Sequence, residues 1–182
     1  MRLPLRLHAT HRGYHIEGAA ADELAPWKEY DDLRKIERAS IRLFMEQYKD
    51  LLVGRVLDFG CGQQPYRDLV TGQYVGVDKD DPIPVGPYDA VICNQVFQYM
   101  IVPETAIGVF AHVLKPGGRL VMTYATNWPV CETTDLWRHT PEGMRLILSF
   151  GDFRIVESEM RAAVVVAGQE MPLGYGLVAE FL

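Results

Sequence analysis

The stretch Val56-Leu57-Asp58-Phe59-Gly60-Cys61-Gly62 decides the fold of this chain. It has the pattern of a buried strand that runs into an acidic residue and then into two glycines at alternate positions. Glycines at such a turn let a ligand lie against the backbone, and the free N–H groups at the start of a following helix point towards that ligand. The stretch therefore predicts a strand, a small-ligand loop and a helix, in that order.

Strands and helices alternate on both sides of this stretch. Short apolar runs bounded by Gly, Pro or Asp predict buried strands at 55–59, 74–77, 88–93 and 118–124. Segments of helical character lie between or after them at 65–70, 103–114 and 141–150. The last residues predict two antiparallel strands, 153–160 and 177–182. This alternation predicts an α/β protein with a mostly parallel sheet, helices on both faces and an antiparallel C-terminal strand.

The length of 182 residues predicts one domain, residues 1–182. Residues 1–30 show no sustained period and are expected to form an irregular arm or cap. Residues 31–52 have apolar side chains at spacings of three and four, which predicts one amphipathic helix. Residues 53–182 then make up the sheet core.

Composition excludes several classes of protein. The net charge of −6 gives no overall cationic field for nucleic acid, and the longest apolar run is far shorter than the roughly 20 residues that cross a bilayer. The three cysteines contain no Cys-x-x-Cys pair, which argues against a disulfide framework and against a zinc site. We expect a cytoplasmic protein with free thiols and no metal, nucleic-acid or membrane partner, as a monomer or homodimer.

Residues 60–65 match neither of two known kinds of nucleotide-binding loop. The dinucleotide fingerprint needs a third glycine, but Pro65 stands at that place, and no Gly-Lys-Ser/Thr follows for a phosphate-binding loop. A second acid, Asp78, ends the next predicted strand and lies 20 residues after Asp58. A carboxylate at the tip of the adjacent strand can accept both hydrogen bonds of a ribose diol, so Asp78 is the predicted ribose ligand.

Four ordered motifs give the chain a family resemblance. Residues 56–62, the strand that ends at Asp78, residues 88–96 and residues 114–120 resemble, in order and spacing, the class I S-adenosylmethionine-dependent methyltransferases. The resemblance covers roughly residues 53–160 and looks most like the small-molecule branch often called methyltransferase type 11. Residues 135–143 are similar to a segment that some members carry after the fifth strand.

The resemblance implies a Rossmann-like sheet of seven strands with S-adenosylmethionine across the carboxyl ends of the strands. Carried over by position, the cofactor-binding residues are Asp58, Gly60, Cys61, Gly62, Asp78, Lys79, Asn94 and Gln95. The chain departs from the family after Asp78, because only nine residues, 79–87, precede Tyr88. We therefore expect the third strand of the family to be absent or reduced to a stub at 83–85.

The implied function is transfer of the methyl group of S-adenosylmethionine to an O, N or C atom of a small-molecule acceptor. The sulfonium is already a good leaving group, so alignment and exclusion of water suffice without a dedicated nucleophile. His139 is the one candidate base, against the alternative that it packs beside a helix start. Two other functions stay open: a cofactor-binding, non-catalytic regulatory or interaction protein, and a nicotinamide oxidoreductase.

Overall fold

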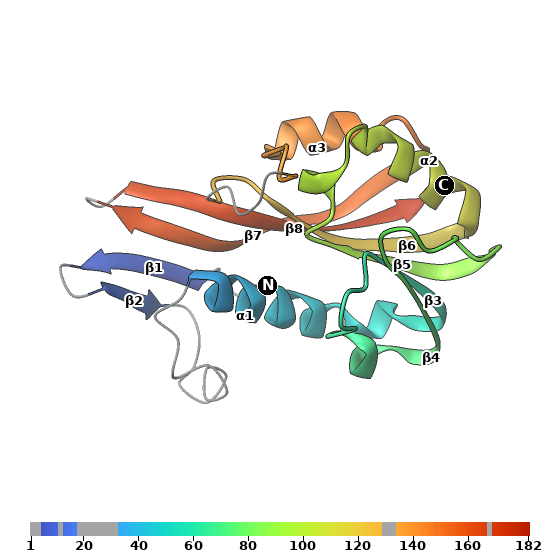
Figure 1. Cartoon of the computed structure of the whole chain (residues 1–182), viewed down its shortest axis with the longest axis horizontal. Coiled ribbons are helices and arrows are strands. Elements are labelled where there is room, and N and C mark those ends of the chain that lie inside the picture. The colour runs from blue at the N-terminus through green and yellow to red at the C-terminus, as the bar shows by residue number, and fades with distance from the viewer. Residues whose placement is uncertain (1–4, 11–12, 18–32, 129–133, 167–168) are drawn as a thin grey trace.

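Eight strands form one mixed sheet in the order β2-β1-β7-β8-β6-β5-β3-β4 in the computed structural model, which describes residues 5–10, 13–17, 33–128, 134–166 and 169–182 (Figure 1). The strands are β1 (Leu5–Thr10), β2 (Gly13–Glu17), β3 (Val53–Phe59), β4 (Thr71–Val77), β5 (Tyr88–Asn94), β6 (Leu114–Ala125), β7 (Phe153–Val166) and β8 (Gln169–Phe181). The helices are α1 (Leu33–Gln47), α2 (Pro103–Val113) and α3 (Pro141–Leu148), with short 3-10 turns η2 (Lys49–Leu51), η3 (Arg67–Leu69) and η4 (Phe97–Tyr99).

The central strands β4, β3, β5 and β6 are parallel, and β8 is antiparallel to both β6 and β7. This arrangement confirms the predicted α/β class, the mostly parallel sheet and the antiparallel C-terminal strand. The sheet has eight strands rather than the seven that the resemblance implies, and β1 and β2 extend it beside β7.

The two faces of the sheet pack against different helices, because successive side chains of a strand point to opposite sides. Leu57 of β3 and Val91 of β5 belong to the apolar core on the face that α2 and α3 cover. Val56 and Ile92 belong to the second core, together with residues of α1. Figure 1 shows α1 on one side of the sheet and α2 and α3 on the other, which confirms the prediction of helices on both faces.

Helix α1 presents a narrow apolar side to the sheet. Ile41, Phe44 and Met45 lie at helical spacing and are nearly inaccessible to solvent. The Phe44 ring lies directly over Gly176 of β8, where a Cβ atom would come within 2.3 Å of the ring. A glycine at this point of β8 therefore lets α1 approach the sheet closely.

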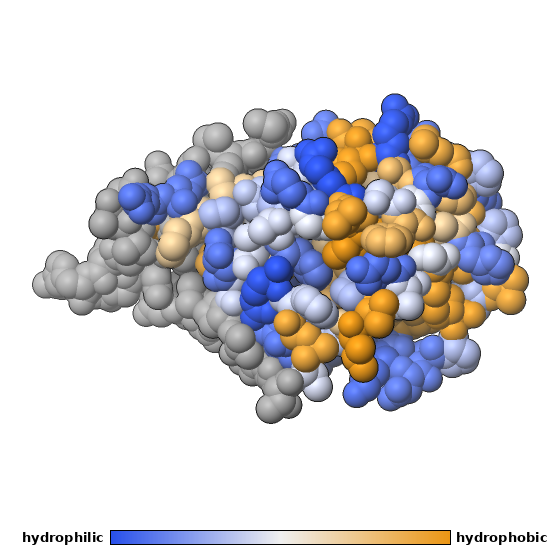
Figure 2. Space-filling model, turned by 90° about the horizontal axis from the view of Figure 1, so that it is seen from above, coloured by the Kyte–Doolittle hydropathy of each residue, from blue (hydrophilic) through white to orange (hydrophobic). Residues whose placement is uncertain are grey.

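The start of α3 follows the chemistry of its sequence. The Thr140 hydroxyl accepts a hydrogen bond from the Gly143 N–H at 3.0 Å, and Pro141 occupies the first turn, where its missing N–H is not needed. Leu146 and Phe150 on this side of the sheet remain 64% and 63% exposed. Figure 2 shows this face from above, with apolar side chains between charged ones.

The sequence left two alternatives for the third strand of the family, its absence or a stub, and the structure shows that it is absent. The connection after β4 contains no strand between residues 79 and 87, and β4 pairs only with β3 among the described strands. Strand β4 is therefore the edge of the sheet. The other expectation, a stub at 83–85, was wrong.

Two further expectations were wrong. The segment 65–70 forms only η3, because the eleven residues that join β3 to β4 contain Pro65 and three residues with positive φ, namely Gly60, Gly62 and Gln64. Part of the expected irregular arm forms a β-hairpin instead: β1 pairs with β2 and, in parallel, with β7. These residues have only a weak periodicity, but β1 forms backbone hydrogen bonds with the free edge of β7, and this pairing makes them a strand. The remaining arm residues lie outside the described ones.

Cys61 and Cys93 are buried free thiols, while Cys131 lies outside the described residues. Within the described ranges, no helix is both long and apolar enough to cross a membrane. Among the same residues, His, Cys, Asp and Glu side chains form no cluster of three or more that is placed for a metal ion.

Candidate functional site

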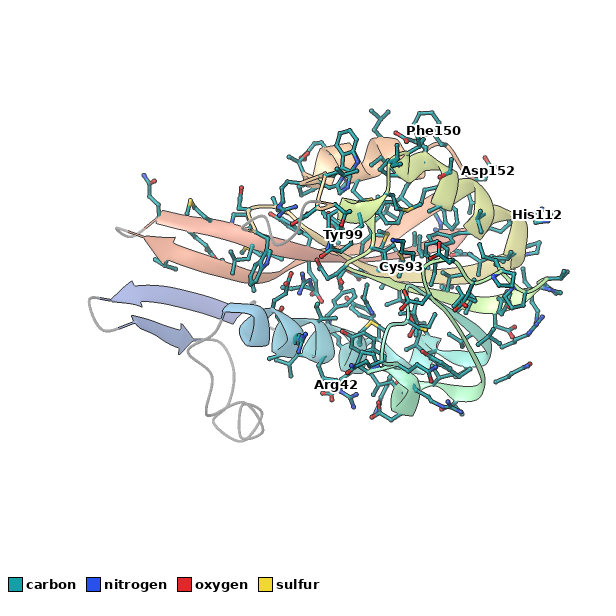
Figure 3. The ribbon with its side chains drawn as sticks, in the orientation of Figure 1. Arg42, Cys93, Tyr99, His112, Phe150 and Asp152 are labelled. Atoms are coloured by element: carbon teal, nitrogen blue, oxygen red, sulfur yellow. The ribbon has the colours of Figure 1, made fainter. Side chains whose placement is uncertain are left out.

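A cavity of about 790 Å³ lies between α1 and the carboxyl ends of β3, β5 and β6. Ligands of open α/β sheets bind at this end of the strands, and the volume falls within the range of about 300–1,000 Å³ that is typical of ligand pockets. Figure 3 shows Arg42 on α1 at one side of the molecule, with Cys93 and Tyr99 near its middle. The polar lining includes Glu37, Asp58, Asn94, Gln95, Gln98 and Arg138.

The glycine loop forms one wall of the cavity. The N–H groups of Gly60 and Cys61 both donate to the carbonyl oxygen of Val77, at 2.8 and 3.0 Å, and so fasten the loop to the end of β4. Gly60 has a φ of +78°, and a Cβ atom there would meet Val96 at 2.4 Å. Gly62 has a φ of +46°, but a Cβ atom there would meet nothing within 4 Å. The loop thus leaves open space beside Gly62 for a ligand.

Asp58 lies at the end of β3 and is only 1% exposed. Its Oδ2 atom accepts a hydrogen bond of 2.6 Å from the hydroxyl of Tyr74 on β4. Burial raises the pKa of the Asp58 carboxyl to about 6, the Tyr74 hydrogen bond lowers it, and the nearby charge of Asp78 raises it further. A buried carboxylate of this kind favours a ligand with a positive charge.

Asn94 is the last residue of β5, Gln95 follows it, and both line the same cavity. The Thr123 hydroxyl of β6 donates to Asn94 Oδ1 at 3.0 Å, whereas Asn94 Nδ2 is buried without a partner among the described residues. Gln95 has a φ of +56°, and its N–H donates to the Thr123 carbonyl oxygen. The amide of Asn94 therefore offers a hydrogen-bond donor to a ligand in the cavity.

Asp78 and Lys79 lie at the exposed end of β4 and do not line the cavity. Asp78 Oδ1 accepts a hydrogen bond from the Lys79 N–H, and the Asp78 N–H donates to the Asp81 carboxylate, both at 2.9 Å. Since the neighbouring Val77 carbonyl holds Gly60, Asp78 lies beside the glycine loop. The structure thus groups six of the eight predicted cofactor residues at the cavity and leaves Asp78 and Lys79 just beyond its edge.

His139 is 7% exposed and does not belong to the cavity lining. Its ring packs edge-on to Phe97 and Tyr124 and is stacked on Trp137. Burial lowers the pKa of the imidazole, so the ring is neutral at pH 7, and its Nε2 atom is buried without a partner among the described residues. The ring can accept a proton, although it stands behind the cavity wall.

A buried charged cluster on the α1 side was missed by sequence reasoning. Arg161 of β7 donates to the Ser40 hydroxyl at 2.6 Å and to the Tyr175 carbonyl at 3.1 Å, and its Nη2 atom lies 3.8 Å from Glu37 Oε1. The Gln95 amide can be oriented so that it forms hydrogen bonds with both Arg161 and Glu37. In this orientation its oxygen accepts from Arg161 at 2.9 Å, and its nitrogen donates to Glu37 at 3.3 Å. The one sequence signal for its burial is that Arg161 stands directly before the apolar run 162–167.

The segment after β6 closes another part of the cavity. Arg138 forms a two-pronged ion pair with Asp135, and its Nε atom donates to the Trp128 carbonyl at 2.7 Å. The N–H groups of Leu136 and Trp137 both donate to the Gln98 carbonyl. These bonds hold the segment against η4 at the cavity wall.

A doubly covered, mostly parallel sheet with a polar cavity at its carboxyl edge defines a Rossmann-like ligand-binding protein. Residues 26–150 match the family of methyltransferase domains. The chain therefore belongs to the methyltransferase domain family. No match was found among curated protein sequences.

Solved structures with the same fold include three named enzymes. The 1,6-didemethyltoxoflavin N1-methyltransferase of Burkholderia thailandensis, with S-adenosylhomocysteine bound, is 12% identical, with a TM-score of 0.58 and coverage of 88% of this chain and 86% of that one. The N-methyltransferase NodS of Bradyrhizobium japonicum, also with S-adenosylhomocysteine, is 18% identical, with a TM-score of 0.53 and coverage of 88% and 95%. The [4+2]-cyclase SpnF is 18% identical, with a TM-score of 0.56 and coverage of 80% and 81%. The fold is thus shared by enzymes of different reactions, and it is the family match that identifies a methyltransferase.

Proposed function

We propose that this methyltransferase moves the methyl group of S-adenosylmethionine to an O, N or C atom of a small molecule bound in the cavity. The observation that carries the proposal is the cavity itself, which lies at the carboxyl ends of the parallel strands and joins the glycine loop to a polar wall on α1. Two of the similar structures contain S-adenosylhomocysteine, the product that such a transfer leaves behind.

The residues present fit S-adenosylmethionine. The open space beside Gly62 lets a ligand approach the backbone, Asp58 can balance positive charge, and the unpaired Asn94 Nδ2 needs an acceptor. In this proposal Asp58, Gly60, Cys61, Gly62, Asn94 and Gln95 hold the methionine and ribose portion of the cofactor. Asp78 binds the ribose hydroxyls, and Lys79 lies beside it.

The bound cofactor supplies a methyl group on a sulfonium, which leaves with its electron pair readily. The chain has to align the acceptor with that methyl group and keep water away. Helix α1 and the segment 134–139 form the walls that do so in this proposal, and the bonds of Arg138 keep the second wall in place. Alignment of this kind explains why the cavity shows cofactor ligands and no catalytic triad among the described residues.

The remaining features of the proposal concern the setting of the protein. The net charge of −6 supports a small-molecule acceptor rather than a nucleic acid. We propose one domain over residues 1–182 that acts in the cytoplasm as a monomer or homodimer.

Calorimetry with S-adenosylmethionine and S-adenosylhomocysteine tests the main proposal: we expect both to bind, and absence of binding at about millimolar ligand would overturn it.

The ribose assignment predicts a specific loss of affinity. Asp78→Ala should weaken binding of S-adenosylhomocysteine 10-fold or more, because a charge-assisted hydrogen bond contributes about 1.5–3 kcal/mol. The dissociation constant is measured by calorimetry. Asp152→Ala is the matched control, since Asp152 is exposed and lies on the opposite side of the molecule from Arg42 (Figure 3). Equal affinities of the two variants would refute the role of Asp78.

A second variant tests His139 as the base for an acceptor that holds its proton. His139→Ala should leave the affinity for S-adenosylhomocysteine unchanged, because the ring lies outside the cavity lining. Turnover should fall if the neutral imidazole accepts a proton, and this is measured with labelled S-adenosylmethionine. Full turnover in the variant removes His139 from the base role and leaves it as a packing residue of the aromatic cluster.

A further inference from the structure

The carboxylate of Glu37 on α1 lines the cavity and has no part in the cofactor assignments above. We propose that Glu37 binds an N–H group of the methyl acceptor, and that the acceptor is therefore an amine. This inference rests on the proposed function and names the substrate class of the same cavity. It is carried by the position of Glu37, by the contacts of its two oxygens and by the chemistry of the transfer.

Glu37 is held firmly in place, and its side chain is only 15% exposed. Its two polar partners in the described part of the chain, Arg161 at 3.8 Å and the Gln95 amide at 3.3 Å, both face Oε1. The Oε2 atom is therefore the one that can accept a hydrogen bond from a ligand. Burial raises the pKa of this carboxyl, which increases its affinity for a proton.

Of the three positive groups that the described residues place around Glu37, Arg161 and Arg138 are engaged by the protein itself, and the third, Arg38, is the next residue of α1 and also lines the cavity. Arg161 donates to Ser40 and Tyr175 and is almost fully buried, so it supports Glu37 from behind. Arg138 is bound to the Asp135 carboxylate and to a backbone carbonyl. Both guanidinium groups thus have partners of their own in the protein. A hydrogen-bond donor on the acceptor is the natural complement of this position.

The chemistry of the transfer favours nitrogen over oxygen as the acceptor atom. An amine can direct its lone pair at the methyl carbon while one of its N–H groups donates to Glu37. The amine attacks in its neutral form. As the new N–C bond forms, the electron pair of the C–S bond returns to sulfur, and the ammonium product keeps its proton, paired with the Glu37 carboxylate, until it is released to water. An alcohol has to lose its proton during attack and so needs a base at the moment of transfer, whereas a neutral amine can be methylated before it gives up a proton.

The rest of the lining indicates what the amine is attached to. Ile41, Tyr99 and Trp128 contribute apolar surface to the same cavity. An aromatic or branched apolar group can pack against these side chains while its amine reaches Glu37. Benzylamine is a suitable probe, with benzyl alcohol as the partner of the same shape that lacks the amine.

The experiment measures the binding of the two probes by calorimetry in saturating S-adenosylhomocysteine. The wild-type protein should bind benzylamine at least about 10-fold more tightly than benzyl alcohol. Glu37→Gln should reduce this preference to less than about 3-fold. Glu157→Gln, which removes an exposed carboxylate of β7, should keep the full preference. The double variant Glu37→Gln/Arg161→Met, which leaves no uncompensated charge in the cluster, replaces the single variant if that one does not fold.

Equal binding of the two probes to the wild-type protein overturns the inference, as does a preference that survives the loss of the Glu37 charge. Binding of S-adenosylhomocysteine is measured first. A protein that binds S-adenosylhomocysteine without any amine preference refutes the role of Glu37 and leaves the proposed function standing. A protein that fails to bind S-adenosylhomocysteine refutes the proposed function itself.

Discussion

Asp58→Asn should stabilise the free protein by about 2–3 kcal/mol at pH 7 and weaken the binding of S-adenosylmethionine about 10-fold or more. The carboxylate is 1% exposed, and burial raises its pKa from the ordinary value of 3.8 to about 6. Keeping it charged at pH 7 therefore costs folding free energy. Asparagine removes the charge and keeps an oxygen for the Tyr74 hydroxyl, but it cannot balance the positive charge of the ligand.

The pH dependence of this effect has a definite sign. Because the folded state binds the proton of Asp58 more tightly than the unfolded state, its contribution to stability is most favourable near pH 4 and falls as the pH rises to about 6. The gain in the free energy of unfolding from Asp58→Asn should thus be largest above pH 6 and become smaller as the pH falls towards 4. Urea denaturation at pH 5.0 and 7.5 measures it, and an equal difference at the two pH values would contradict the assignment.

Arg161→Met should lower the free energy of unfolding by about 3–5 kcal/mol, the usual cost of removing one member of a buried ion pair. Arg161 is 5% exposed, and its loss strands the Glu37 carboxylate and takes a hydrogen-bond donor from the Ser40 hydroxyl and the Tyr175 carbonyl. The deficit should shrink as the pH falls, since protonation removes the stranded charge of Glu37. Denaturation in urea at pH 5.0 and 7.5 measures both effects.

A second substitution separates the charge effect from the packing effect. Adding Glu37→Gln to Arg161→Met should restore more than half of the lost stability, because no buried charge is then left without a partner. Each single variant is compared with the double variant in a thermodynamic cycle. Losses that simply add would show that Glu37 and Arg161 do not interact.

The sequence predicted the parts of the fold that depend on local pattern. Four buried strands, α2 and the capped start of α3 were found at their expected places because each has its own periodicity or its own turn chemistry. The same applies to the part of the polar lining that the sheet contributes, since Asp58, Gly60 and Asn94 lie at or directly after the carboxyl ends of strands. Parallel strands bring such ends together at one edge of the sheet.

The features that the sequence did not predict depend on distant partners. Strands β1 and β2 exist because β7 has a free edge, and a weak local pattern cannot show that edge. Glu37 and Arg161 are 124 positions apart and meet only after α1 has packed on the sheet. A charge on a helix and a charge in a strand are each common on protein surfaces, so neither residue by itself indicates a buried pair.

The missing third strand reduces the connection between β4 and β5 to a bare loop. Gly76 of β4 and Ile92 of β5 are both level with Asp58 of β3. Tyr88 therefore lies about 13 Å back along the sheet and about 10 Å across it from Gly76, a straight distance of about 16 Å. Twelve Cα steps join the two residues and can reach about 40 Å when extended. The loop thus has length to spare, and we expect the sheet to tolerate its shortening by one residue.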